Sequence, residues 1–202
     1  MNHAIDFQSI SYDLLTITSR KKTLHNQLFR VESGKVLLKL GKNEYVFNAG
    51  DAFWLPIECL MSLTILPNSQ LSLVKLSVRL ADQFPKKAGK VHLSPLSKAL
   101  LDKLLHESDL ATVKDLLQVV RREIIELQPK LAQTPECLAI SKWQPKSDSI
   151  SGELSLVLLV REARKQRLSG TKLDVICDNL FAGNREQLQL LSLSLLGNTE
   201  LD

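Results

Sequence analysis

The stretch that decides the fold runs from Val31 to Phe47 and reads VESGKVLLKLGKNEYVF. Its apolar, β-type runs are separated by two short turn signals, Ser33-Gly34 and Gly41-Lys42-Asn43, which leave no room for a helix. Similar runs recur throughout Asp13–Arg79, at Ala52–Pro56, Ser62–Leu66 and Ser72–Val78. Many short strands at close spacing are typical of a small antiparallel barrel or sandwich.

Beyond Phe84-Pro85 the apolar period changes from that of strands to that of helices. Ser94-Pro95 combines a capping hydroxyl with proline at the first helical position, which predicts the start of a helix. A second helix is expected over Asp109–Leu127, and helical periodicity returns over Glu153–Leu196. The predicted fold class is therefore α+β, with an N-terminal antiparallel β-barrel or sandwich followed by an all-helical C-terminal region.

The same patterns divide the chain into four segments. Residues 1–88 form the strand-rich domain, and residues 89–128 form a helical segment. Residues 129–151 contain three prolines and are predicted to be a loose linker. Residues 152–202 form a second helical segment, which is the tail of the chain.

Composition indicates an ordinary globular protein. The chain has 202 residues, of which 44% are hydrophobic and 24% are charged, and its formal net charge is +4. No apolar run approaches the ~20 residues that cross a bilayer, and the N-terminus does not read as a signal peptide. We therefore expect a cytoplasmic protein with no membrane partner.

The sequence shows no pattern typical of a metal site or an active site. Cys59, Cys137 and Cys177 lie far apart and have neither zinc nor disulfide spacing. Nucleophile-elbow, phosphate-loop and metalloprotease motifs are absent from the sequence. We expect no cofactor, no metal and no enzymatic activity.

Several segments of the strand-rich half have a distinctive order and spacing. They are His25–Phe29, Gly34, Asn48–Pro56 and Val91–Leu96. In this order they resemble the N-terminal regulatory half of AraC-family transcription regulators, over about residues 10–130. The resemblance implies a cupin-like β-barrel that senses a small-molecule effector, and a helix after the barrel that supplies the contact of a homodimer.

The tail resembles one of the two helix-turn-helix units with which AraC-type regulators end. Leu173, Ile176, Cys177 and Leu180 have the spacing of the first helix of such a unit, and Ala182-Gly183-Asn184 reads as its turn. The chain then departs from the family pattern. A DNA-reading surface needs basic residues for phosphates and polar side chains for base edges. From residue 173 onward there is one arginine, Arg185, against five acidic residues.

Two functions from different classes therefore stay open. The first is an AraC-type transcriptional regulator that binds DNA as a homodimer. The alternative is a non-DNA-binding interaction protein that modulates a full-length regulator or another protein partner. A small-molecule binder without a transcriptional role is a more remote third reading.

The resemblance also implies an effector pocket in the barrel. Its candidate residues are His25, Gln27, Phe29, Trp54 and Met61. For each of them the alternative is a structural role, which for Trp54 means a place in the core. The metal-binding cupin pattern is not met, because His25 has no second imidazole partner and Met61 stands where the family has a histidine.

Two further surfaces are candidates for contacts with other molecules. The predicted dimer face of the helix over Asp109–Leu127 consists of Val113, Leu116, Leu117, Val120, Ile124 and Leu127. The same stripe fits packing on the chain's own barrel equally well. The predicted DNA contacts are Arg161, Arg164, Lys165, Arg167, Lys172 and Arg185. Their alternative is the solvated face of a helix.

Overall fold

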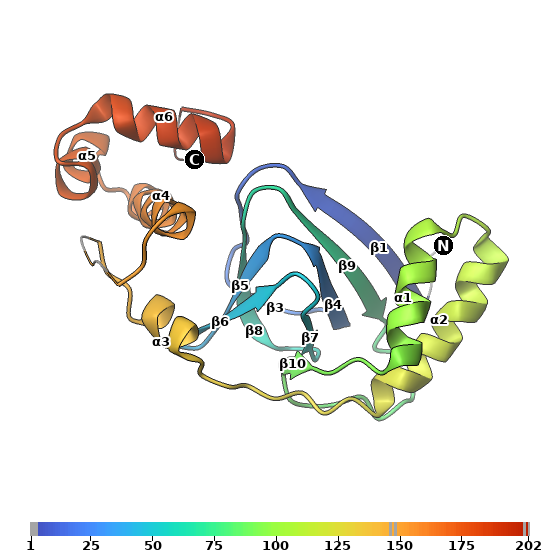
Figure 1. The fold of residues 1–202 in the computed structure, drawn as a ribbon. Helices are drawn as coiled ribbons and strands as arrows, with labels where there is room; N and C mark the ends of the chain where they lie inside the picture. The colour runs from blue at the N-terminus through green and yellow to red at the C-terminus, as the bar shows by residue number, and fades with distance from the viewer. Residues whose placement is uncertain (1–3, 146, 148, 200, 202) are drawn as a thin grey trace.

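The structure is a computed structural model that describes residues 4–145, 147, 149–199 and 201. Two antiparallel sheets form the N-terminal part, and six helices follow them within the described residues (Figure 1). The α+β class, with strands first and helices after, is confirmed.

The strands form two antiparallel sheets, in which neighbouring strands are often not consecutive in the chain. Sheet A has the order β1-β9-β4-β7-β10, and sheet B has the order β2-β8-β5-β6, with β3 also paired to β8. The strands of sheet A are β1 (Ile5–Tyr12), β9 (Ser69–Leu76), β4 (Asn26–Ser33), β7 (Ala52–Leu55) and β10 (Gly89–Val91). The strands of sheet B are β2 (Thr16–Ile17), β8 (Leu60–Ile65), β5 (Lys35–Leu40), β6 (Asn43–Asn48) and β3 (Lys21–Lys22).

Turns are present at both predicted places in Val31–Phe47, at Gly34 and at Gly41. Gly34, between β4 and β5, has φ +81°, and a Cβ at this position would collide with Ser69. Gly41 lies between β5 and β6, where Leu40 pairs with Asn43. The Gly34 turn carries the chain from sheet A to sheet B, and the Gly41 turn sets the register of β5 and β6, the strands that supply Lys39 and Glu44 to the candidate site.

The described residues contain six helices, four of which begin at a side-chain cap. They are α1 (Pro95–His106), α2 (Leu110–Ile125), α3 (Pro135–Ser141), α4 (Glu153–Leu168), α5 (Leu173–Phe181) and α6 (Arg185–Leu196). Side chains of Ser94, Asp109, Thr134 and Asn184 accept hydrogen bonds from the backbone of α1, α2, α3 and α6 respectively. Among the described helices, none has both the length and the apolar character needed to cross a bilayer.

Three apolar clusters hold the layers together. The inner face of sheet A, with Phe29 and Phe53, packs on sheet B. The outer face of sheet A, with Leu28 and Trp54, packs on α1 and α2. The outer face of sheet B, with Leu37, packs on α4, α5 and α6. Both sheets are therefore covered on two sides by other parts of the same chain.

Three boundaries differ from the sequence-based prediction. The strand-rich domain has its first strand, β1, before Asp13, where the expected strand runs began, and β1 pairs with β9 along its whole length. It also extends beyond residue 88, because β10 pairs with β7. Residues 129–151 are not a loose linker throughout, because they contain α3. This helix packs on β6 and buries Cys137 and Ile140.

Candidate ligand-binding cleft

A cleft of about 550 Å³ lies between the outer side of sheet B and α4, and we call it the α4 cleft. It is lined by Ile17, Thr18, Ser19, Arg20, Lys39, Glu44, Ser62, Thr64, Arg161, Glu162, Arg164, Lys165, Leu168 and Ser169. Five of these side chains are basic and two are carboxylates. The excess of basic groups makes the cleft attractive to anions.

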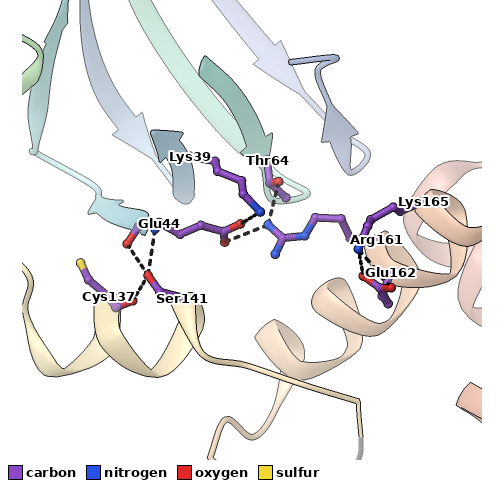
Figure 2. A network of polar contacts seen from close by, with 8 residues as sticks. All are labelled: Lys39, Glu44, Thr64, Cys137, Ser141, Arg161, Glu162 and Lys165. Carbon is purple, nitrogen blue, oxygen red and sulfur yellow. Dashed lines mark hydrogen bonds and ion pairs between the residues drawn. The ribbon is translucent and has the colours of Figure 1, made fainter. Parts of the chain in front are cut away.

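The floor of the α4 cleft is a network centred on Glu44 (Figure 2). Its carboxylate accepts a hydrogen bond from Arg161 Nη1 at 3.0 Å and lies 3.7 Å from Lys39 Nζ. Arg161 Nη1 also donates to Thr64 Oγ1 at 3.2 Å. The side chain of Glu44 is 4% exposed, so its charge is stabilised by these partners and not by bulk water.

The backbone of Glu44 is held separately by α3. Its N–H donates to Ser141 Oγ at 2.8 Å, and Ser141 Oγ in turn donates to the carbonyl of Cys137 at 2.7 Å (Figure 2). One residue at the start of β6 thus receives contacts from strands, from α3 and from α4. The Arg161 contact adds a polar tie between α4 and sheet B to the apolar packing there, and the Ser141 contact ties α3 to β6.

Arg164 lies nearly one helical turn after Arg161 and lines the same cleft. Its Nε is buried and has no hydrogen-bond partner in the described part of the chain. A buried donor without an acceptor is unfavourable. An oxygen of a bound carboxylate or phosphate would supply that acceptor, and the planar guanidinium suits such groups.

Lys165 and Glu162 form the outer rim of the α4 cleft. The Lys165 ammonium lies 3.0 Å from a carboxylate oxygen of Glu162, and the lysine side chain is 72% exposed. A pair this exposed contributes little to stability. Lys165 is therefore able to leave Glu162 for a stronger anion at little cost.

The barrel residues predicted to contact an effector do not line one cavity. Phe29 and Met61 lie in the apolar cluster between the two sheets. The ring of Phe29 stacks on Phe53 with 4.8 Å between the centroids. At this place the space between the sheets is filled by side chains.

The other three predicted effector residues lie elsewhere. Trp54 is fully buried on the opposite face of sheet A, where its Nε1 donates to the carbonyl of Pro85 at 2.8 Å. His25 is exposed just before β4, and Gln27 is half-buried within β4. The structural role that the sequence left open for Trp54 is the one observed.

The apolar stripe of α2 packs on its own chain. Leu117, Val120 and Ile124 are buried in the cluster that covers the outer face of sheet A, and Val113, Leu116 and Leu127 are partly buried against it. Of the two alternatives that the spacing allowed, intramolecular packing is confirmed. A homodimer remains a prediction, and this stripe is already occupied.

The six basic residues predicted to contact DNA separate into two groups. Three of them, all on α4, line the α4 cleft as described above. The other three are exposed outside it: Arg167, Lys172 and Arg185. Arg185 Nη1 lies 3.6 Å from a carboxylate oxygen of Asp174. The second group does not line the α4 cleft.

The predicted turn between the last two helices is present. Helix α5 ends at Phe181, the next residue, Ala182, has φ 52° in the left-handed region, and Asn184 caps α6. Ile176, Cys177 and Leu188 form the buried contact between the two helices and their surroundings. The chain thus ends in two helices, α5 and α6, that are joined by a short turn.

Sequence reasoning missed Glu44, Thr64 and Arg20 as parts of a site. The available signal was a single carboxylate in β6 beside the apolar run Tyr45–Phe47. Burial raises the pKa of the Tyr12 hydroxyl and of the Cys59 thiol, but neither group lines the α4 cleft. Across the described residues, His, Cys, Asp and Glu side chains form no group of three or more that could hold a metal ion.

In sequence, the chain matches no protein-family model and no curated relative. Among solved structures it is similar to the apo form of a ToxT variant from Vibrio cholerae, with 12% identity and a TM-score of 0.47, over 96% of this chain and 95% of that chain. It is also similar to an RmlC-like cupin from Shewanella frigidimarina, with 20% identity and a TM-score of 0.35, over 39% and 71% of the two chains. A cupin superfamily protein from Desulfitobacterium hafniense has 9% identity and a TM-score of 0.35, over 38% and 71%.

Proposed function

We propose that this chain is a transcription regulator of the AraC type, and that it senses an anionic small molecule in the α4 cleft. The resemblance of the segments between His25 and Leu96 supports the regulatory class. The order of a sandwich, a helix pair and a helix-turn-helix outline agrees with it. The observation that carries the sensing role is the buried, unpartnered Nε of Arg164 in a cleft rich in basic groups.

The walls of the α4 cleft come from two parts of the molecule, and this gives the cleft a means of signalling. Sheet B supplies one wall, and α4 supplies the other. Helix α4 also packs on α5 and α6. A ligand held by Arg164 and by the sheet therefore favours one position of the helices over others.

A thermal unfolding experiment tests the sensing role. Citrate and pyrophosphate are titrated at constant ionic strength, with glucose as the neutral comparison. A ligand at one hundred times its Kd stabilises the folded state by about 2.7 kcal/mol. For a chain of this size we expect the unfolding midpoint to rise by about 5–10 °C.

Two variants separate a specific site from general anion effects. Arg164→Gln removes the guanidinium in the cleft and should abolish the rise in midpoint. Lys172→Gln removes an exposed basic group outside the cleft and should leave the rise unchanged. The absence of any rise in the parent protein, or an equal rise in Arg164→Gln, would refute the proposal.

A second candidate function is that of an interaction protein that does not bind DNA, and the charge of α5 and α6 favours it. Asp174, Asp178 and Glu186 are exposed on these helices, and Arg185 lies beside Asp174. Phosphates are repelled by such a surface. Helix α6, which stands where a recognition helix is expected, therefore has few groups that could bind DNA.

Binding to a labelled random-sequence duplex, followed from about 50 to 200 mM salt, decides between the two functions. Each phosphate contact adds about −0.9 to the slope of log K against log salt. Contacts through Arg167, Lys172 and Arg185 would give a slope of about −2.7. Lys172→Gln should then weaken the slope by about one contact, whereas Lys103→Gln on α1 should not. No binding at low salt would favour the interaction protein.

A further inference from the structure

One end of the sandwich exposes apolar side chains that belong to adjoining loops. Leu24, with 76% of its surface exposed, precedes β4, Ile57 is exposed in the turn before β8, and Leu60 is exposed as the first residue of β8. The loops are joined by backbone hydrogen bonds between Thr23 and Cys59 (3.1 Å) and between Glu58 and Thr23 (2.9 Å). Large apolar groups that are both exposed and contiguous indicate an interaction surface.

The same end extends across a shallow hollow of about 500 Å³, which is lined by Ile57, the exposed Val78 and Lys86, among others. The charged groups around it are mostly basic. Lys21 and Lys22 lie on β3 beside Leu60, and Arg79, Lys86 and Lys87 are exposed near Val78. Two acids lie here as well: Asp82 is bound to Arg121 at 2.6 Å, and Glu58 is exposed between Ile57 and Leu60. We call this surface the basic end.

The opposite chemistry is found on α6. Leu190, which is 67% exposed, and Leu193 line a groove of about 370 Å³ together with Glu186, Gln189 and Thr199. Asp174 and Asp178 are exposed on the adjoining α5. We call this surface the acidic groove. Within the described residues, both surfaces are left uncovered by the chain itself.

We propose that the basic end of one copy of this chain binds the acidic groove of a second copy. Each surface joins exposed leucine, isoleucine or valine side chains to charges that are mostly of one sign, basic at one end and acidic at the other, with Glu58 and Arg185 as the exposed exceptions. Apolar contact supplies affinity, and complementary charge supplies orientation and speed of encounter. Because the two surfaces differ, the contact is head-to-tail and leads to chains or rings of more than two copies.

Nucleic acid is a weaker match to the basic end. Phosphates need lysine and arginine, but they do not need four exposed aliphatic side chains among them. The head-to-tail contact is independent of the α4 cleft, because the residues that line the cleft belong to neither surface.

Sedimentation velocity over a concentration series, with two charge-reversed variants, tests the proposal. The first variant, Lys21→Glu with Lys22→Glu, inactivates the basic end. The second, Asp178→Lys with Glu186→Lys, inactivates the acidic groove. All four positions are exposed, so both variants should keep the circular dichroism spectrum and midpoint of the parent. Each variant alone should associate at least about tenfold more weakly than the parent.

Mixing the two variants gives the decisive measurement. Each retains the surface that the other has lost, so an equimolar mixture should form a 1:1 dimer and nothing larger. A matched control, Lys98→Glu with Lys103→Glu on α1, should associate like the parent. A parent that is monomeric at all concentrations, or a mixture that stays monomeric, overturns the proposal. Binding of a duplex to the basic end of a monomeric parent would do the same and assign that surface to nucleic acid.

Discussion

Replacing Glu44 by glutamine should destabilise the protein far more than an ordinary surface substitution does. The change keeps the size of the side chain and removes its negative charge. It leaves the Arg161 guanidinium without its anionic partner at a position where α4 meets sheet B. The backbone hydrogen bond from Glu44 to Ser141 does not involve the side chain and should persist.

The magnitude follows from the burial of the two partners. Removal of one member of a buried ion pair costs about 3–5 kcal/mol. Here Arg161 is 22% exposed and keeps some access to water, and glutamine still offers an oxygen acceptor. We therefore expect a loss of about 2–3 kcal/mol. In a chain of this length, that loss lowers the unfolding midpoint by about 5–10 °C.

The assay is thermal and urea unfolding of three proteins: the parent, Glu44→Gln and Glu162→Gln. The last is a matched control, because it makes the same chemical change in a pair whose lysine is largely exposed. It should lose no more than about 1 kcal/mol. A double variant, Glu44→Gln with Arg161→Met, should recover part of the loss, because it leaves no unpaired guanidinium.

The result that would refute this reasoning is a midpoint for Glu44→Gln no lower than that for Glu162→Gln. Water would then replace the lost contact between Glu44 and Arg161 at as little cost in stability as it does for a surface ion pair. The Glu44 network would not be what holds α4 against sheet B.

Three other measurements test separate parts of the structure. Ile124→Ala should destabilise the chain by about 2–4 kcal/mol in urea unfolding and leave its sedimentation unchanged, because the stripe of α2 is buried within one chain. Hydrogen bonds from Thr112 lower the pKa of Asp109, so the stability that Asp109 adds is present above its ordinary pKa and is lost as the pH falls through its lowered value. Asp109→Asn should therefore lose less stability than the parent in unfolding titrations between about pH 5 and pH 2. Burial raises the pKa of the Cys59 thiol, so it should react with Ellman's reagent at about pH 8 more slowly than free cysteine does, and the buried Cys137 and Cys177 should react only on unfolding.

Local turn and capping chemistry made much of the fold predictable. Gly34 and Gly41 adopt positive φ angles, which glycine tolerates, at the two turns that the sequence predicted. Ser94 and Asp109 cap helices at the expected positions. Strand β1 was not predicted, and the reason also lies in its local sequence. Its sequence, IDFQSISY, is half polar and its residues are mostly half-exposed, so its alternation is weak. Only pairing with β9, more than fifty residues away, defines it as a strand.

The orientation of Trp54 could not be predicted, because sheet A is covered on both faces. Phe53, Trp54 and Leu55 are all apolar and all buried, so no alternation of polar and apolar residues shows which of them faces the inside. The register with β4 decides it: Phe29 pairs with Phe53, and Leu28 pairs with Trp54 on the outer face. Long-range pairing, and not local sequence, assigns the effector candidates to different layers.

The α4 cleft was hidden from sequence reasoning for the same physical reason. Glu44 follows a turn and would be read as a solvated residue, but Ser141 and Arg161, which are 97 and 117 residues further along, cover it. The spacing of Arg161, Arg164 and Lys165 places them on one helical face whatever that face meets. Because this face meets sheet B, Arg161 and Arg164 are partly covered, whereas Lys165 at the rim stays exposed. Three of the six predicted DNA contacts, Arg167, Lys172 and Arg185, lie outside the cleft, and the inner three are the groups on which the proposed anion site rests.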